Sequence, residues 1–150
     1  MTEHTVRVEW KRTTADFSYP SYSRDHKWIF KSSVEVPATA AAKYLGSPGR
    51  VDPEEAFVAA LSSCHMLSFL AIASRRRHTV DSYEDDAVGY LEPNADGKLV
   101  ITRVILRPAV QFSGDRPPKP EQIELMHHQA HDECFIANSV KTDVRVEPSS

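Results

Sequence analysis

The sequence predicts an α+β fold with a mainly antiparallel sheet, and two observations support this prediction. The expected elements follow the order β-β-α-β-β-α-β along the 150 residues. Connections of hairpin length dominate, and the alternating strand-helix crossovers that a parallel sheet requires are absent. A chain of this length can bury roughly 68–70% of its unfolded surface around one core, so we expect a single domain spanning residues 1–150.

Two short strands are expected before the first helix. Residues 6–10 alternate apolar and polar side chains and include β-branched residues, which is typical of a half-buried strand. The alternation ends over residues 11–24, where Pro20 favours an extended or turning segment. A second strand is expected over residues 28–36. The alanine-rich residues 37–50 fit either a short helix or a loop.

A long helix is expected to begin at residue 52. Asp52 can cap the helix, Pro53 suits its first position, and a glutamate follows at the third position, as in a capping box. Three arginines at 75–77 suit the negative end of the helix dipole. At ~1.5 Å per residue this helix would be about 36 Å long. Its apolar stripe is expected to contain Phe57, Ala60, Leu61, Cys64, Leu67, Ser68, Ala71 and Ile72.

The rest of the chain predicts a hairpin, a second helix and a closing strand. Residues 79–91 and 98–112 are strand candidates, and the turn residues at 93–97 can join them as a β-hairpin. After a proline-rich break, residues 121–134 carry apolar side chains at roughly helical spacing. Residues 140–146 alternate in polarity and are expected to form the last strand.

Composition argues against two classes of partner. The chain has 18 Lys and Arg against 21 Asp and Glu, so nothing in its overall charge attracts nucleic acid or an anionic membrane. Residues 1–5 lack the features of a secretion signal, and no apolar run approaches the ~20 residues of a membrane helix. We therefore expect a soluble, cytoplasmic protein with no nucleic-acid or membrane partner. Its two cysteines are expected to be thiols in a reducing cytosol.

Cys64 is the first candidate for chemistry, although a cysteine on an apolar stripe is most often a small hydrophobic residue. Burial raises the pKa of a thiol, so a reactive Cys64 needs a cation or hydrogen-bond donors nearby. Glu54 and Glu55 precede it by ten and nine residues and project from different faces. One can cap the helix, and the other can orient an arginine. Arg24 is the best local candidate because it follows an irregular, tyrosine-bearing segment, although most single arginines are solvated surface charges.

The second predicted helix offers an alternative chemistry. His127 and His131 are separated by four residues and Cys134 follows three residues later, a spacing that could place three ligands around Zn²⁺. No Cys-x-x-Cys or His-Glu-x-x-His motif accompanies them, and such histidines are most often surface residues. His65 follows Cys64 directly but projects about 100° away around the helix, so it is not automatically the base of that cysteine. Glycine-rich phosphate loops and a Gly-x-Ser-x-Gly motif are absent from the sequence.

The segment Val51–Cys64, with the sequence VDPEEAFVAALSSC, resembles the OsmC/Ohr family of osmotically inducible and organic hydroperoxide resistance proteins. In that family the helix opens with an Asn/Asp-Pro-Glu turn and reaches its reactive cysteine ten residues after the glutamate. Glu54 and Cys64 have this spacing. The resemblance extends over about residues 6–146, and Cys134 stands where the family has its second cysteine, seventy residues after the first.

The resemblance implies a thiol-dependent peroxidase that reduces organic hydroperoxides and hydrogen peroxide, without a cofactor, in defence against oxidative stress. It also implies an intertwined homodimer in which antiparallel sheets pack around long central helices. By position, Cys64 corresponds to the peroxidatic cysteine and Cys134 to the resolving cysteine. Glu54 corresponds to the carboxylate that holds an arginine, and we assign Arg24 to that role. The cycle would pass through a sulfenic acid and a Cys64–Cys134 disulfide, which a cellular dithiol would reduce.

Two departures from the family pattern point to an OsmC-like branch. Phe135 follows Cys134 where the family commonly has proline, and residues 19–26 differ from the glycine-bearing loop of the organic hydroperoxide resistance members. The alternative function is a non-catalytic protein of the same fold that binds a small ligand, or zinc through His127, His131 and Cys134.

Overall fold

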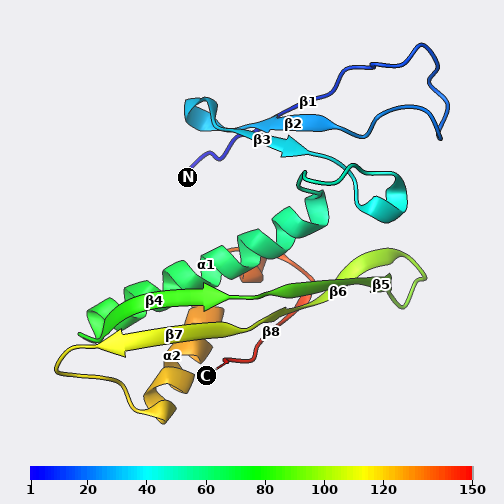
Figure 1. Cartoon of the computed structure of the whole chain (residues 1–150). Helices are drawn as coiled ribbons and strands as arrows, with labels where there is room; N and C mark the ends of the chain where they lie inside the picture. Colours follow the sequence, from blue (N-terminus) through cyan, green and yellow to red (C-terminus); the bar gives the residue numbers. More distant parts are fainter. Residues whose placement is uncertain (150) are drawn as a thin grey trace. The chain divides into compact units, whose positions relative to one another are not determined.

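The computed structural model describes residues 1–149, and within them the fold is α+β, as predicted. Contacts divide the chain into two compact units, one comprising Met1–Ala56 and the other beginning at Phe57. Over residues 1–149 the structure contains two α-helices and three small sheets. Helix α1 (Pro53–Arg75) starts at the end of the first unit and continues into the second (Figure 1).

The first unit is built on an antiparallel sheet in the order β1-β2-β3. The single strand expected over residues 28–36 is wrong, because the chain reverses direction inside this range. Ser32 and Ser33 have positive φ values of 61° and 60°, and the Phe30 amide donates to the Val34 carbonyl oxygen (2.8 Å) to close the turn. The elements are β1 (Arg7–Glu9), β2 (His26–Ile29), the 3₁₀ turn η1 (Lys31–Ser33), β3 (Glu35–Ala38) and η2 (Ala42–Tyr44).

The capping box at the start of α1 is confirmed. The Asp52 carboxylate accepts a hydrogen bond from the Glu55 amide (2.8 Å), and the Glu55 carboxylate accepts one from the Asp52 amide (3.4 Å). Glu55 is therefore the capping glutamate and is exposed, whereas the half-buried Glu54 is not used by the cap. This resolves the choice between the two glutamates that the sequence left open.

The second unit contains the predicted hairpin, but each of its arms is broken into two strands. β5 pairs with β6 around the turn at residues 94–97, while β4 pairs with β7. The break lies at Asp85, whose carboxylate accepts hydrogen bonds from the Arg107 amide (2.6 Å) and the Ser62 hydroxyl. A side chain thus satisfies an amide at the point where the strand pairing changes. The strands are β4 (Thr79–Asp85), β5 (Val88–Pro93), β6 (Leu99–Leu106) and β7 (Pro108–Ser113).

The closing strand β8 (Asp143–Val146) is shorter than expected and pairs with β6 in parallel orientation. Helix α2 (Pro120–Glu133) precedes it and agrees with the expected helix to within one residue at each end. The parallel pair is possible because residues 107–142, which include α2, supply the long connection that a parallel partner requires.

The core of the second unit lies where α1 and α2 meet the strands. Phe69 and Ile72 of α1 pack with Met126 and Ala130 of α2, and partly buried side chains of β4 and β7 cover them. A second cluster joins Leu61 of α1 to β6. Together these clusters fix one face of α1 against α2 and the strands.

The opposite face of α1 is exposed, so the predicted apolar stripe is only partly buried. Ala60, Leu67 and Ala71 are exposed, and Leu67 retains 60% of its accessible surface. By length and composition α1 could cross a membrane: an 18-residue window has mean hydropathy 1.9, and 28% of that window is buried. The expectation that no segment is long and apolar enough is therefore wrong for α1. The core helix of a soluble protein passes the same test.

Candidate functional site

The structure brings the two cysteines together within the second unit. Cys64 lies in the middle of α1, and Cys134 is the C-terminal cap residue of α2. The Cys64 side chain lies close enough to the Cys134 thiol to raise its pKa, and neither cysteine is in a disulfide. The proximity of two free thiols that are seventy residues apart in sequence requires the packing of α1 against α2.

The two thiols differ in exposure. Cys64 is half-buried, whereas Cys134 retains 1% of its accessible surface. Burial, reinforced by the neighbouring Cys64 side chain, raises the pKa of the Cys134 thiol to about 11. Cys134 is therefore protonated at neutral pH, and Cys64 is the cysteine of the pair that a small molecule can reach from solvent.

The backbone after α2 fixes the position of the Cys134 sulfur. The Ala137 amide donates to Sγ (3.4 Å), and the Asn138 side chain donates to the Cys134 carbonyl oxygen (3.0 Å). The 3₁₀ turn η3 (Ala137–Ser139) places both donors. Phe135, at the position where the family commonly has proline, is exposed. The local turn therefore holds the sulfur without proline.

Arg24 and Glu54 line one pocket of the first unit, of about 610 Å³. Within residues 1–149, no ion pair links Arg24 to a carboxylate. Its guanidinium instead donates to the carbonyl oxygens of Tyr22 and Tyr19, the latter at 2.7 Å. It also lies over both tyrosine rings, 3.7 Å and 4.6 Å from their centroids. The structure thus places Arg24 and Glu54 on one cavity without pairing them.

Aromatic side chains form much of the wall of this pocket. Trp10, Phe17 and Tyr22 pack on one another, with ring centroids 4.9 to 6.2 Å apart. Such a wall suits an apolar group, and the guanidinium and carboxylate offer polar contacts beside it.

Arg50 is a second arginine of the first unit that the sequence analysis overlooked. It forms an ion pair with Asp25 (3.4 Å) and donates to the carbonyl oxygens of His26 (3.0 Å) and Ala38 (3.2 Å). Hydrogen bonds from the side chains of Ser47 and Thr39 lower the pKa of Asp25, and the positive charge of Arg50 lowers it further. Since Arg50 ties β2 and β3 to the segment that leads into α1, these contacts support the sheet.

A buried pair of histidines is the other feature that sequence spacing could not reveal. Nε2 of His65 on α1 lies 3.0 Å from Nδ1 of His127 on α2, and the two rings stack with centroids 5.3 Å apart. Both side chains are buried, and desolvation lowers the pKa of each to about 4. Both rings are therefore uncharged at neutral pH. A separation of 62 residues gives no periodic signal for such a contact.

The zinc alternative is not supported. Within residues 1–149, no group of three His, Cys, Asp or Glu side chains is placed to hold a metal ion. Nδ1 of His127 faces His65, and the Cys134 sulfur accepts a hydrogen bond from the Ala137 amide. One nitrogen of His127 and the sulfur of Cys134 are thus engaged by groups other than a metal ion.

Comparison with known proteins gives consistent results. The family described as OsmC-like protein matches residues 46–149. An OsmC-like protein of unknown function from Vibrio cholerae is 50% identical, with a TM-score of 0.96 over 99% of this chain and 100% of the other. The organic hydroperoxide resistance protein OhrB of Bacillus subtilis is 16% identical, with a TM-score of 0.71 over 99% and 98% of the two chains. A Legionella pneumophila protein named as an organic hydroperoxide resistance protein is 14% identical, with a TM-score of 0.68 over the full length of both. No curated protein matches the chain.

Proposed function

The chain belongs to the OsmC-like protein family, and from this premise we propose that it is a cysteine-based peroxidase that reduces organic hydroperoxides and hydrogen peroxide. The observation that carries the proposal is the pair of neighbouring free thiols, one reachable from solvent and one buried. Such a pair can be oxidised to a disulfide with the loss of two electrons and two protons. The names of the distant structural relatives favour hydroperoxides as the oxidant.

In the proposed cycle Cys64 is the residue that attacks the hydroperoxide. Its thiolate takes the terminal oxygen of the hydroperoxide, the O–O bond breaks, and the released alkoxide leaves as an alcohol after taking up a proton. Cys64 becomes a sulfenic acid. The sulfur of Cys134 then displaces the hydroxyl group, which leaves as water with the Cys134 proton, and an S–S bond forms. A cellular dithiol reduces this disulfide and is itself oxidised, which returns both thiols.

The assignment of the two roles rests on exposure and acidity. A buried thiol with a pKa of about 11 is a poor first nucleophile, because only a minute fraction is thiolate at neutral pH. It remains suitable as the second sulfur, since a sulfenic acid formed on Cys64 would arise beside it. We therefore propose Cys64 as the peroxidatic and Cys134 as the resolving cysteine.

Arg24 and Glu54 enter the proposal as positioning residues. Their shared pocket with an aromatic wall supports a role in binding an apolar group. The stabilisation of the thiolate by Arg24 is proposed from the family resemblance alone. Glu54→Gln keeps the size of the side chain and removes its charge. We expect this variant to react more slowly with peroxide and to show a changed pH profile of thiol alkylation. Glu55→Gln, at the exposed cap, is the matched control. Identical profiles for wild type and Glu54→Gln would contradict the role.

We also propose that two copies of the chain, each acting as one domain, form a cytoplasmic homodimer through the exposed face of α1. The support is the apolar character of that helix and the exposure of Leu67. Leu67→Glu is expected to convert a dimer into a monomer in analytical ultracentrifugation. A monomeric wild type, or partition of wild type into lipid vesicles, would contradict the dimer.

A single-turnover titration tests the function. Reduced protein is mixed with substoichiometric cumene hydroperoxide, free thiols are counted, and the disulfide is mapped by peptide mass. We expect rapid loss of peroxide and a Cys64–Cys134 disulfide that dithiothreitol reverses. Cys64→Ser should consume no peroxide, and Cys134→Ser should complete one turnover and then over-oxidise. Turnover by Cys64→Ser, or slow oxidation without this disulfide in wild type, would refute the proposal.

A further inference from the structure

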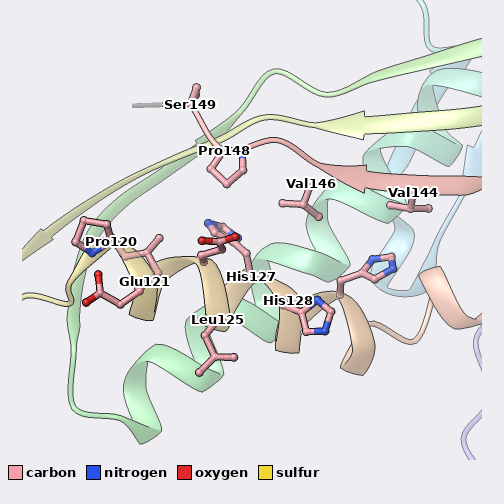
Figure 2. A pocket seen from close by; sticks show the side chains of 12 residues that line it. Pro120, Glu121, Leu125, His127, His128, Val144, Val146, Pro148 and Ser149 are labelled. Atoms are coloured by element: carbon pink, nitrogen blue, oxygen red, sulfur yellow. The ribbon is translucent and has the colours of Figure 1, made fainter.

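A second cavity, of about 880 Å³, lies between α2 and β8 in the second unit. Figure 2 shows Leu125, His127 and His128 of α2 on one side and Val144 and Val146 of β8 on the other. Neither Cys64 nor Cys134 is among its lining residues. The cavity is therefore distinct from the thiol pair, and the peroxidase cycle does not use it.

His127, which lines the cavity, carries a buried polar atom that lacks a partner. His127 retains 4% of its accessible surface, and its Nδ1 is engaged by His65. One face of its ring stacks on Phe69, with centroids 4.3 Å apart. Its Nε2 is buried and has no hydrogen-bond partner within the part of the chain that the structure describes. Because a buried nitrogen without a hydrogen-bond partner is unfavourable, a cavity-lining His127 favours a molecule that pairs with it.

The protonation of the histidine pair determines which chemical groups of a ligand can pair with Nε2 of His127. With both rings uncharged, one proton lies between His65 and His127, and its position fixes the tautomer of each ring. If His65 donates, Nε2 of His127 carries a proton and seeks an acceptor; if His127 donates, its Nε2 is an acceptor. A hydroxyl group satisfies either state, because it both donates and accepts. A carbonyl group can only accept, so it satisfies only the state in which Nε2 of His127 carries a proton.

The remaining lining argues against a charged anion. Glu121 and Glu124 line the cavity and would repel a carboxylate or phosphate. Ile123, Val144 and Val146 supply apolar wall, which suits a hydrocarbon body. The cavity volume lies in the range of small-molecule sites, roughly 300–1,000 Å³.

We propose that the cavity between α2 and β8 is a binding site for an uncharged small molecule with an apolar body and a hydroxyl group, which pairs with Nε2 of His127. The site is independent of Cys64, so its occupation does not require the peroxidase activity.

Cyclohexanol is a suitable probe, and cyclohexanecarboxylate is the matched anion. In a titration followed by ¹⁵N NMR of the histidine side chains, we expect cyclohexanol to shift the His127 Nε2 resonance saturably. The carboxylate should bind at least tenfold more weakly. His127→Phe keeps an aromatic ring on Phe69 but removes the nitrogen, and it should weaken cyclohexanol binding about tenfold. Glu133→Gln, on the same helix but outside the cavity lining, should bind like wild type.

Two outcomes would overturn the proposal. One is the absence of a saturable His127 shift in wild type, which would mean that water alone meets this nitrogen. The other is equal affinity for cyclohexanol in wild type and His127→Phe. If His127→Phe does not fold, Val146→Trp replaces it as the test variant. This substitution narrows the cavity from the β8 side and should abolish the shift, whereas an unchanged titration would place the probe elsewhere and refute the site.

Discussion

The buried histidine pair predicts a steep loss of stability in mild acid. Desolvation lowers the pKa of His65 and His127 in the folded protein to about 4, and neighbouring histidines lower that of His65 further while Asp85 opposes the shift. In the unfolded chain both titrate near 6.5. Below this value the unfolded chain binds more protons than the folded protein, so the free energy of unfolding falls as the pH drops from about 6.5 towards 4.

The size of this effect follows from the two pKa values. Between pH 7.5 and pH 5.0, each histidine contributes a loss of about 2 kcal/mol in the free energy of unfolding, and the pair about 4 kcal/mol. Stability that depends on these two groups is fully present above about pH 7.5. Since small domains have about 5–15 kcal/mol in total, the loss would be readily measured.

The assay is urea unfolding at several pH values between 7.5 and 5.0, followed by circular dichroism. The double variant His65→Gln/His127→Gln replaces both imidazoles with side chains that do not titrate and should lose most of the pH dependence. His128→Gln, at an exposed position of α2, is the control and should retain the wild-type slope. The same slope in the double variant as in wild type would refute the assignment of the acid sensitivity to this pair.

Three further predictions concern packing and capping. Met126→Ala, in the core between the helices, should cost about 2–5 kcal/mol in urea unfolding, whereas Leu125→Ala on the exposed side of α2 should cost under about 1 kcal/mol; equal losses would contradict the placement of α2. Gly89→Ala would place its Cβ 2.6 Å from a methyl group of Val58 on α1. We therefore expect the free energy of unfolding to fall by about 1–3 kcal/mol in the same assay. An unchanged free energy of unfolding would show that α1 lies farther from β5. Asp52→Ala removes the carboxylate that accepts the Glu55 amide and should lower stability by about 1 kcal/mol, measured as a lower melting temperature; an unchanged melting temperature would mean that the cap is not used.

Local signals in the sequence predicted local structure well. The Asp-Pro-Glu-Glu turn located the start of α1, and the turn residues at 93–97 located the hairpin between β5 and β6, because both depend on residues close in sequence. The strand expected over residues 28–36 failed, since two serines in a left-handed conformation are not a common turn signal. The stripe on α1 was only partly right because an all-round apolar helix does not reveal which face meets its own chain.

The candidate site likewise combines features that the sequence predicts with features that arise only from packing. Motif spacing was enough to identify the family resemblance, and that resemblance singled out Cys64, Cys134, Glu54 and Arg24 as candidate site residues. The fold was needed to show that Cys64 and Cys134 are neighbours, that Cys134 is the buried one, and that His65 meets His127 beside an open cavity. The reason is physical: exposure, desolvation and contact between α1 and α2 arise from packing of segments some 60 to 70 residues apart, which no local pattern encodes.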